Sequence, residues 1–205
     1  MRTWCAAYLI LAMSAGAQPK PAEWRPLFDG KTLGKWHETA FKGAGKARVA
    51  EGALVLGAGG PLTGITWSGE FPHAAYEIRF EARRMQGNDF FASLTFPVGE
   101  SYCTWVMGGW GGDIVGLSSI DGWDASDNET RNYFTFENNR WYAMRLRVTT
   151  ARITAWIDEK QMIDVEITGR AIGLRPGEIK LNTPLGFASY NTAGELRKIE
   201  YRAPL

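Results

Sequence analysis

Apolar and polar residues alternate over several short stretches of this chain, which is the pattern of β-strands with one buried and one solvated face. Within residues 75–83, apolar side chains alternate with Glu and Arg. The alternation recurs in residues 141–149 and continues in residues 152–157 and 162–167, with turn-forming residues between them. These stretches predict one long strand and a three-strand meander.

Further strands are predicted where short apolar runs lie between Gly, Pro, Asn or Asp residues. No stretch after the N-terminal segment has a persuasive helical period, and residues 58–64 are expected to form a loop. We therefore predict an all-β fold, a sandwich of two antiparallel sheets over about residues 24–203. The further strands are expected at residues 49–56 (strand, turn, strand), 90–96, 102–107, 133–136, 185–190 and 195–202.

Two carboxylates, Glu77 and Glu81, share one face of the strand predicted at residues 75–83. Paired carboxylates are the groups that glycosidases use as acid, base or nucleophile. Arg79 and Arg83 interleave with them on the same face, so an outer surface covered by ion pairs is the favoured interpretation.

The densest candidate chemistry lies in residues 108–130. The first half is rich in glycine around Trp110, and glycine allows close backbone approach or a positive φ. The second half contains Trp123 among four acidic residues. Clustered carboxylates repel one another unless water, a cation or a hydroxyl-rich ligand relieves the repulsion. The acids are Asp121, Asp124, Asp127 and Glu129.

Three interpretations of these acids are open. In the first, Asp121, Asp124 and Glu129 are acid/base groups or ligand contacts in a sugar cleft. In this case Trp110 and Trp123 are the aromatic side chains that stack on sugar rings, because such rings present apolar C–H faces.

In the second interpretation the segment binds calcium, which takes oxygen ligands. The ligands would be Asp121, Asp127, Asn128 and Glu129 with backbone carbonyls, although their spacing differs from the EF-hand loop. In the third, the segment only caps turns and meets water, with Ser126 and Asp127 at a turn.

Size and charge narrow the choice of function. The 205 residues suit one domain. The net charge is +1 and the basic residues form no block, which argues against a nucleic-acid partner. The chain has two histidines, His37 and His73, which is little material for a catalytic triad or a zinc site. We predict no cofactor, with calcium as the one alternative.

Residues 1–17 have the features of a secretory signal peptide: Arg2, a short apolar run and a small-residue cleavage site. Cleavage would leave residues 18–205 as a single secreted or periplasmic domain without membrane attachment; an uncleaved anchor is the alternative. Cleavage would also remove Cys5, so Cys103 would have no intramolecular partner and is expected to be a buried thiol.

Several segments carry a family resemblance. Residues 27–36 read Leu-Phe-Asp-Gly-Lys-Thr-Leu-x-x-Trp, and residues 49–56, 141–158 and 195–201 have further typical patterns. In these segments the chain resembles the 3-keto-disaccharide hydrolase-like domain family, formerly a domain of unknown function. The resemblance implies a concanavalin A-like jelly roll, a fold shared with lectins and glucanases, and a secreted bacterial protein.

The middle of the chain departs from the family pattern. Many members read Asn-Ser-Gly before a buried strand and Tyr-Glu-x-Gln later, and only Asn88 and Tyr102 correspond here. The family's Glu falls at Cys103 and its Gln at Trp105. The Glu-x-Asp-x-x-Glu strand of lectin-like glucanases is absent as well. A catalytic acid in this chain must therefore be sought elsewhere, in residues 121–129.

The resemblance implies a glycoside as the substrate, with a sugar oxidised at C3 as one form. A 3-keto group acidifies the neighbouring C–H, so one carboxylate base, Asp121 or Asp124, and a polarising group would suffice for elimination. The alternatives are a non-catalytic glycan-binding module on the same face and an assembly or adhesion module. The expected saccharide contacts are Asn88, Tyr102, Trp110, Trp123 and Asp127.

Overall fold

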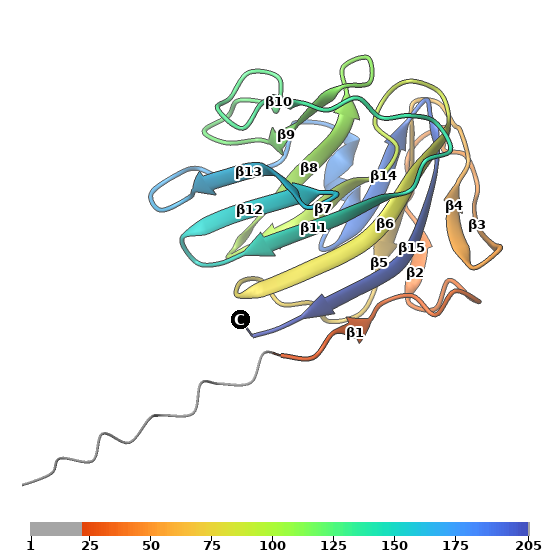
Figure 1. Cartoon of the computed structure of the whole chain (residues 1–205), viewed down its shortest axis with the longest axis horizontal. Helices are drawn as coiled ribbons and strands as arrows, with labels where there is room; N and C mark the ends of the chain where they lie inside the picture. Colours follow the sequence, from red (N-terminus) through yellow and green to blue (C-terminus); the bar gives the residue numbers. More distant parts are fainter. Residues whose placement is uncertain (1–21, 205) are drawn as a thin grey trace, which may run out of the picture.

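Two β-sheets pack face to face in the computed structural model, which describes residues 22–204 (Figure 1). All paired strands are antiparallel. The eight-stranded sheet has the order β13 (Lys160–Glu166), β12 (Arg152–Ile157), β11 (Tyr142–Val148), β6 (Tyr76–Gln86), β15 (Ala193–Arg202), β4 (Ala53–Leu56) and β3 (Ala47–Ala50), with β1 (Arg25–Pro26) paired to β15. The seven-stranded sheet has the order β10 (Asn132–Tyr133), β9 (Ile114–Ser118), β8 (Ser101–Gly109), β7 (Ser93–Val98), β14 (Gly186–Tyr190), β5 (Leu62–Trp67) and β2 (Trp36–Glu38).

The sheets meet through buried aromatic and aliphatic side chains. Phe80 of β6 and Phe187 of β14 contact edge to face across the interface, with ring centroids 4.8 Å apart. Trp36 packs on Phe187 at 5.5 Å, and its indole N–H donates to the Leu27 carbonyl at 2.9 Å. Each buried Phe contributes about 1.5–3 kcal/mol. The opening segment is thus part of the core, and the predicted two-sheet jelly roll is confirmed.

The strand predicted at residues 75–83 is confirmed as β6, whose inward side chains are buried. The ion-pair interpretation of its outer face is also confirmed. Glu77 is nevertheless not solvated, because its side chain has 0% exposure beneath its arginine partners. The partners of Glu77 are Arg145, Arg147 and Arg202, and those of Glu81 are Arg197 and Lys198.

At four places the predicted boundaries of strands and loops differ from the structure. The loop expected at residues 58–64 instead leads into β5, which starts at Leu62. Residues 108–130 contain β9, a strand that the glycine-rich pattern concealed. The strand expected at residues 133–136 ends at Tyr133, because Phe134 and Phe136 turn their rings onto Tyr142. The strand expected at residues 90–96 begins only with β7.

Cys103 lies on β8 with 0% exposure, as predicted for a structural thiol. Burial raises its pKa to about 12, against a smaller lowering by a backbone hydrogen bond at Thr104. Thiolates are the reactive form, so we expect Cys103 in the folded protein to resist iodoacetamide at pH 8. Mass spectrometry of the Cys103 peptide should show labelling only after urea is added. Rapid labelling without urea would contradict this burial.

The predicted signal at residues 1–17 lies outside the described residues. No helix of residues 22–204 is both long enough and apolar enough to cross a lipid bilayer. The start of the mature domain at residue 18 stays a prediction.

Candidate functional site

A pocket of about 410 Å³ opens on the outer face of the seven-stranded sheet. Its floor includes Ser93 of β7, Thr104 of β8 and Ser118 of β9. Alternate strand residues point to opposite faces, so these side chains point outward while Leu94 and Trp105 enter the core. The floor therefore offers hydroxyl groups and little bulk.

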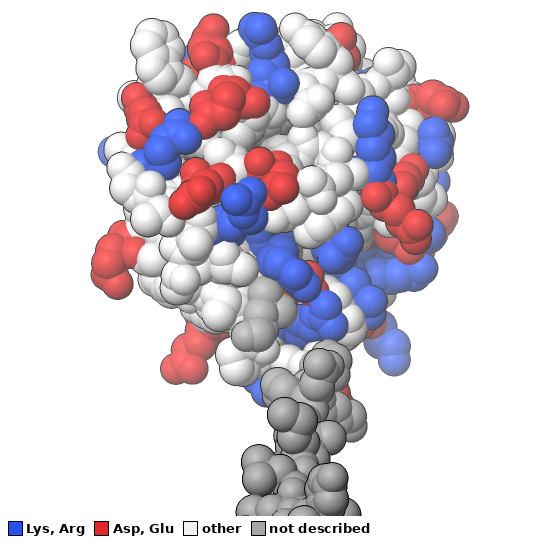
Figure 2. All heavy atoms as spheres, turned by 60° about the vertical axis from the view of Figure 1, so that its left-hand side comes forward, with Lys and Arg blue, Asp and Glu red and all other residues white. Residues whose placement is uncertain are grey.

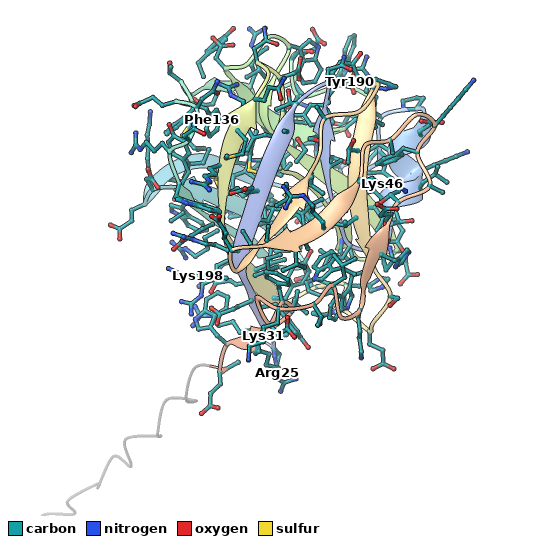
Figure 3. The ribbon with its side chains drawn as sticks, turned by 90° about the vertical axis from the view of Figure 1, so that its right-hand side faces the viewer. Arg25, Lys31, Lys46, Phe136, Tyr190 and Lys198 are labelled. Carbon is teal, nitrogen blue, oxygen red and sulfur yellow. The ribbon has the colours of Figure 1, made fainter. Side chains whose placement is uncertain are left out.

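Three aromatic side chains belong to the pocket lining. Trp110, at the start of the predicted stretch, is 40% exposed and forms part of the wall. Phe90 and Tyr190 pack together with ring centroids 5.7 Å apart, and both line the same pocket. Tyr190 lies at the end of the sandwich opposite Arg25 (Figure 3). Exposed rings beside hydroxyl and charged groups suit a ligand with apolar faces and polar edges.

The glycine-rich loop is held against the turn before β7. The carboxylate of Asp89 accepts hydrogen bonds from the backbone N–H groups of Phe90 (2.8 Å) and Gly111 (3.3 Å). Gly112 has φ 120°, and a Cβ at this position would lie 2.5 Å from the Asn88 carbonyl oxygen. Only glycine permits this approach. Asp89 is thus a pocket carboxylate with one oxygen on the loop that carries Trp110 and the other on the N–H of its neighbour Phe90.

The connection between β13 and β14 forms the other wall of the pocket. Gly173 and Ser119 exchange two backbone hydrogen bonds of 2.7 and 3.1 Å, just before the residues that line the pocket. At its end, in the 3₁₀ turn η1 (Glu178–Asn182), the buried Asn182 amide donates to Thr39 and to the Ile65 carbonyl at 2.8 Å. Both ends are therefore fixed to the sandwich. The wall residues between them are Arg175, Pro176, Glu178 and Ile179.

Two charged residues of this connection face the pocket. The Arg175 guanidinium lies 5.6 Å from the centroid of the Trp110 ring and forms an ion pair of 3.3 Å with Asp124. One oxygen of Glu178 accepts a hydrogen bond of 3.3 Å from the Lys42 backbone N–H. The other Glu178 oxygen has no hydrogen-bond partner within residues 22–204. Glu178 therefore has one carboxylate oxygen at the pocket wall that is bonded to no other described residue.

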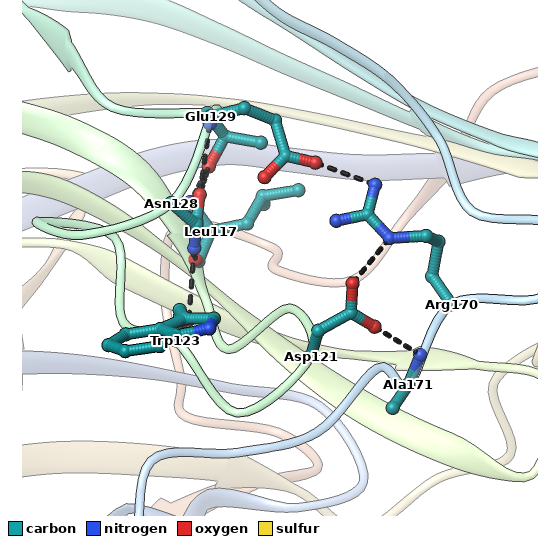
Figure 4. A network of polar contacts seen from close by, with 8 residues as sticks. Leu117, Asp121, Trp123, Asn128, Glu129, Arg170 and Ala171 are labelled. Atoms are coloured by element: carbon teal, nitrogen blue, oxygen red, sulfur yellow. Dashed lines mark hydrogen bonds and ion pairs between the residues drawn. The ribbon is translucent and has the colours of Figure 1, made fainter.

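Asp121 and Glu129 are both bound by Arg170, at 2.6 Å each (Figure 4). The Ala171 N–H and then Arg170 lower the pKa of Asp121, and Arg170 lowers the pKa of Glu129. The two carboxylates in turn raise the pKa of Arg170. Neither Asp121 nor Glu129 belongs to the pocket lining. Their arrangement joins the acid-rich segment to the connection after β13.

Asn128 determines the shape of the acid-rich segment. Its amide N–H groups donate to the carbonyls of Leu117 (2.8 Å) and Trp123 (3.0 Å), and its oxygen accepts from the Thr130 hydroxyl at 2.6 Å. The Ser126 hydroxyl donates to Asp127 at 2.6 Å. Among residues 22–204, no three His, Cys, Asp or Glu side chains are placed to bind a metal. The calcium interpretation, whose ligands also include Asn128 and backbone carbonyls, stays a prediction.

The remaining predicted contacts lie around the pocket or away from it. Asn88 is exposed beside Asp89, at the pocket's edge. Tyr102 lies on β8 with its ring 6.1 Å from the His73 ring. Trp123 is 62% exposed on the acid-rich segment. The structure thus brings Trp110 into the pocket and Asp124 to its edge through Arg175, and leaves Tyr102, Asp121, Trp123, Asp127 and Glu129 outside the lining.

The sequence analysis missed several pocket residues. Their signals were weak: a turn at Asn88 and Asp89, and a break at Pro176 and Gly177. Neither turn nor break shows by itself which distant segment it will face. The missed side chains are Asp89, Phe90, Arg175, Glu178 and Tyr190.

Comparisons with known proteins agree with the fold. A family model described as "3-keto-alpha-glucoside-1,2-lyase-like domain" matches residues 23–202. A carbohydrate-binding module, CBM66 from Bacillus subtilis, is similar in structure with a TM-score of 0.56 and 10% identity, over 82% of this chain and 96% of that one. A Bacillus licheniformis β-glucanase is similar with a TM-score of 0.55 and 10% identity, over 91% of this chain and 100% of that one. No curated protein matches the sequence.

Proposed function

Because this chain belongs to the family of 3-keto-alpha-glucoside-1,2-lyase-like domains, we propose that it binds a 3-keto-glycoside in the pocket and cleaves it by elimination. The supporting observation is that Arg175 and Glu178, a cation and a carboxylate, line one pocket together with the exposed Trp110. An aromatic wall provides affinity for the sugar ring, and the two charged groups provide the chemistry.

The proposed reaction needs one base and one group that stabilises negative charge. Glu178 accepts the proton from C2 of the oxidised sugar, next to the C3 ketone. The electron pair left at C2 delocalises onto the C3 oxygen, where Arg175 stabilises the charge. The enolate then collapses to a C1=C2 double bond, and the C1–O bond to the leaving sugar breaks. Water protonates the departing oxygen.

Glu178 is the preferred base among the carboxylates near the pocket. Both oxygens of Asp89 already accept backbone hydrogen bonds, one from Phe90 and one from Gly111 of the loop, so neither is without a partner. Asp124 lies against Arg175 and outside the lining. Glu178 lines the pocket and has one oxygen without a partner among the described residues. A proton acceptor requires such a free oxygen within reach of substrate.

Two tryptophans allow a matched test of where the sugar binds. We expect Trp110→Ala to weaken binding of a 3-keto-α-glucoside about tenfold or more, because an exposed ring of the pocket wall is lost. Trp123→Ala removes an equally large ring outside the pocket and should change the affinity less than about twofold. Isothermal titration calorimetry, with the unoxidised disaccharide in parallel, measures both.

The outcomes separate the candidate functions. A larger loss of affinity with Trp123→Ala than with Trp110→Ala would place the sugar-binding site at the acid-rich segment. Binding of the unoxidised sugar with equal affinity, and no cleavage of the 3-keto form, would overturn the lyase proposal and favour a lectin-like module.

A further inference from the structure

The outer face of the eight-stranded sheet carries an ordered set of charges, on the opposite side of the sandwich from the pocket. Glu77 on β6 has Arg147 of β11 and Arg202 of β15 as its register partners. Arg79 follows Glu77 by two positions on β6, and its register partners are Arg145 of β11 and Glu200 of β15. Each row therefore crosses three adjacent strands.

Three guanidinium groups share the one carboxylate of Glu77. Arg147 and Arg202 donate to it at 2.7 and 2.6 Å, and Arg145 contacts it at 3.3 Å. The Glu77 side chain is 0% exposed, whereas those of Arg145 and Arg147 are 39% and 43% exposed. The negative charge is thus covered and the positive charges reach the surface. A guanidinium has five donors, so these bonds leave N–H groups of Arg145 and Arg147 available.

The next row places two like charges side by side. Arg79 and Arg145 are direct register partners, a pairing that is unfavourable when nothing lies between them. Each is stacked on an indole: Arg79 on Trp24 at 4.1 Å and Arg145 on Trp156 at 3.7 Å. A hollow of about 670 Å³ lies beside them, with Ala143 contributing to its lining. This surface, defined by Arg79, Arg145, Arg147, Arg202 and Trp156, is called the arginine face below.

Acidic side chains also border the hollow, and most are neutralised. Glu81 is paired with Arg197 and Lys198 at 2.6 and 2.7 Å, and Glu200 with Arg79 at 2.7 Å. Glu159 lies at the far margin, in the turn between β12 and β13. Figure 2 shows Lys and Arg gathered where the described chain begins, with acidic residues above and to both sides. The positive surface is therefore local and bounded.

We propose that the arginine face binds an acidic polysaccharide that carries uronate carboxylates. Free guanidinium N–H groups pair with carboxylates in a bidentate manner. Trp156 lines the hollow beside Arg145 and adds apolar surface for a sugar ring, whereas Trp24 is covered by Arg79 and Arg202. Arg147 and Arg202 come from the strands on either side of β6, and their guanidinium groups converge on the Glu77 carboxylate. With Arg79 and Arg145 in the adjacent row, several guanidinium groups lie on one surface, and a polymer that carries a carboxylate on every sugar can contact more than one of them at a time. A nucleic acid has a higher charge density and would also meet the acidic border.

The test uses polygalacturonate as the probe and dextran as the uncharged control. We expect the double substitution Arg79→Gln/Arg145→Gln to lower affinity for polygalacturonate about tenfold or more. Glu77 keeps Arg147 and Arg202 in this variant, so the fold is retained, which thermal unfolding checks. Arg48→Gln, an exposed arginine of β3 at the other edge of the sheet, should have little effect.

This proposal is independent of the pocket, and its outcomes are distinct. Arg175→Gln should leave polygalacturonate binding unchanged. No binding by the unmodified protein, or a loss with Arg175→Gln and not with the double substitution, would overturn it. Equal affinity for double-stranded DNA would show general polyanion binding and overturn the glycan assignment. Weaker binding at higher salt is expected, since the contacts are between exposed charges.

Discussion

Replacing Glu178 with Gln is expected to lower the rate of 3-keto-glycoside cleavage by about 10²- to 10⁴-fold. The amide keeps the size of the side chain and its contact with the Lys42 N–H, but it accepts no proton from C2. Binding of the substrate should change little, because the aromatic wall stays intact. Single-turnover rates and calorimetric affinities, measured on the same preparation, separate the two effects.

Asp124→Asn is the matched comparison, because Asp124 lies at the edge of the same pocket and is paired with Arg175. We expect a smaller loss of rate from Asp124→Asn, since Arg175 stays in the pocket wall. A large loss with Asp124→Asn and a normal rate with Glu178→Gln would assign the base to the acid-rich segment, as first predicted. Normal rates for both variants would exclude both carboxylates.

Replacing Glu77 with Gln is expected to destabilise the fold by about 2–3 kcal/mol, which lowers Tm by about 4–12 °C. The substitution leaves three arginines around a neutral group whose side chain has 0% exposure. The expected cost is below that of a fully buried pair, because Arg145 and Arg147 are partly solvated and can turn outward. Chemical denaturation at neutral pH measures it.

Glu200→Gln is the control, because its ion pair with Arg79 is exposed and should cost less than about 1 kcal/mol. The pH dependence of stability provides a second test of the contribution of Glu77. Burial raises its pKa, but hydrogen bonds from Arg202 and Arg147 outweigh burial, so the pKa is lowered. Its stabilisation is therefore present above the unfolded pKa of about 4.3 and is lost as pH falls through the folded pKa. A difference in stability between wild type and Glu77→Gln that does not shrink as the pH falls below about 4 would contradict this.

The sequence predicts strands well where one face is solvated. β6, β11 and β12 alternate because the outer face of their sheet meets water and ion pairs. β5 and β9 were missed because they are buried on both faces, so apolar or small residues occupy both. On β9, Gly116 has Ala125 of the acid-rich segment directly over it, at 3.0 Å from an added Cβ.

The candidate site was only partly predictable for a related reason. Trp110 was found because an indole among glycines is hard to bury. Arg175 and Glu178 follow an ordinary Pro-Gly break, and only the fold brings them to a tryptophan more than sixty residues earlier in the chain. The acids at Asp121 and Glu129 attracted attention because their repulsion was evident, while their shared partner, Arg170, was distant in sequence.

The connection that carries Arg175 and Glu178 has fixed ends, and this bears on how the protein can be re-engineered. Gly173 is joined to Ser119 by backbone hydrogen bonds, and Asn182 is inserted between Thr39 and β5. The intervening residues add side chains to the pocket without belonging to either sheet. Residues 174–181 can therefore be treated as an exchangeable cassette. Libraries confined to these positions, with Arg175 and Glu178 kept, should change sugar selectivity while the sandwich keeps its stability.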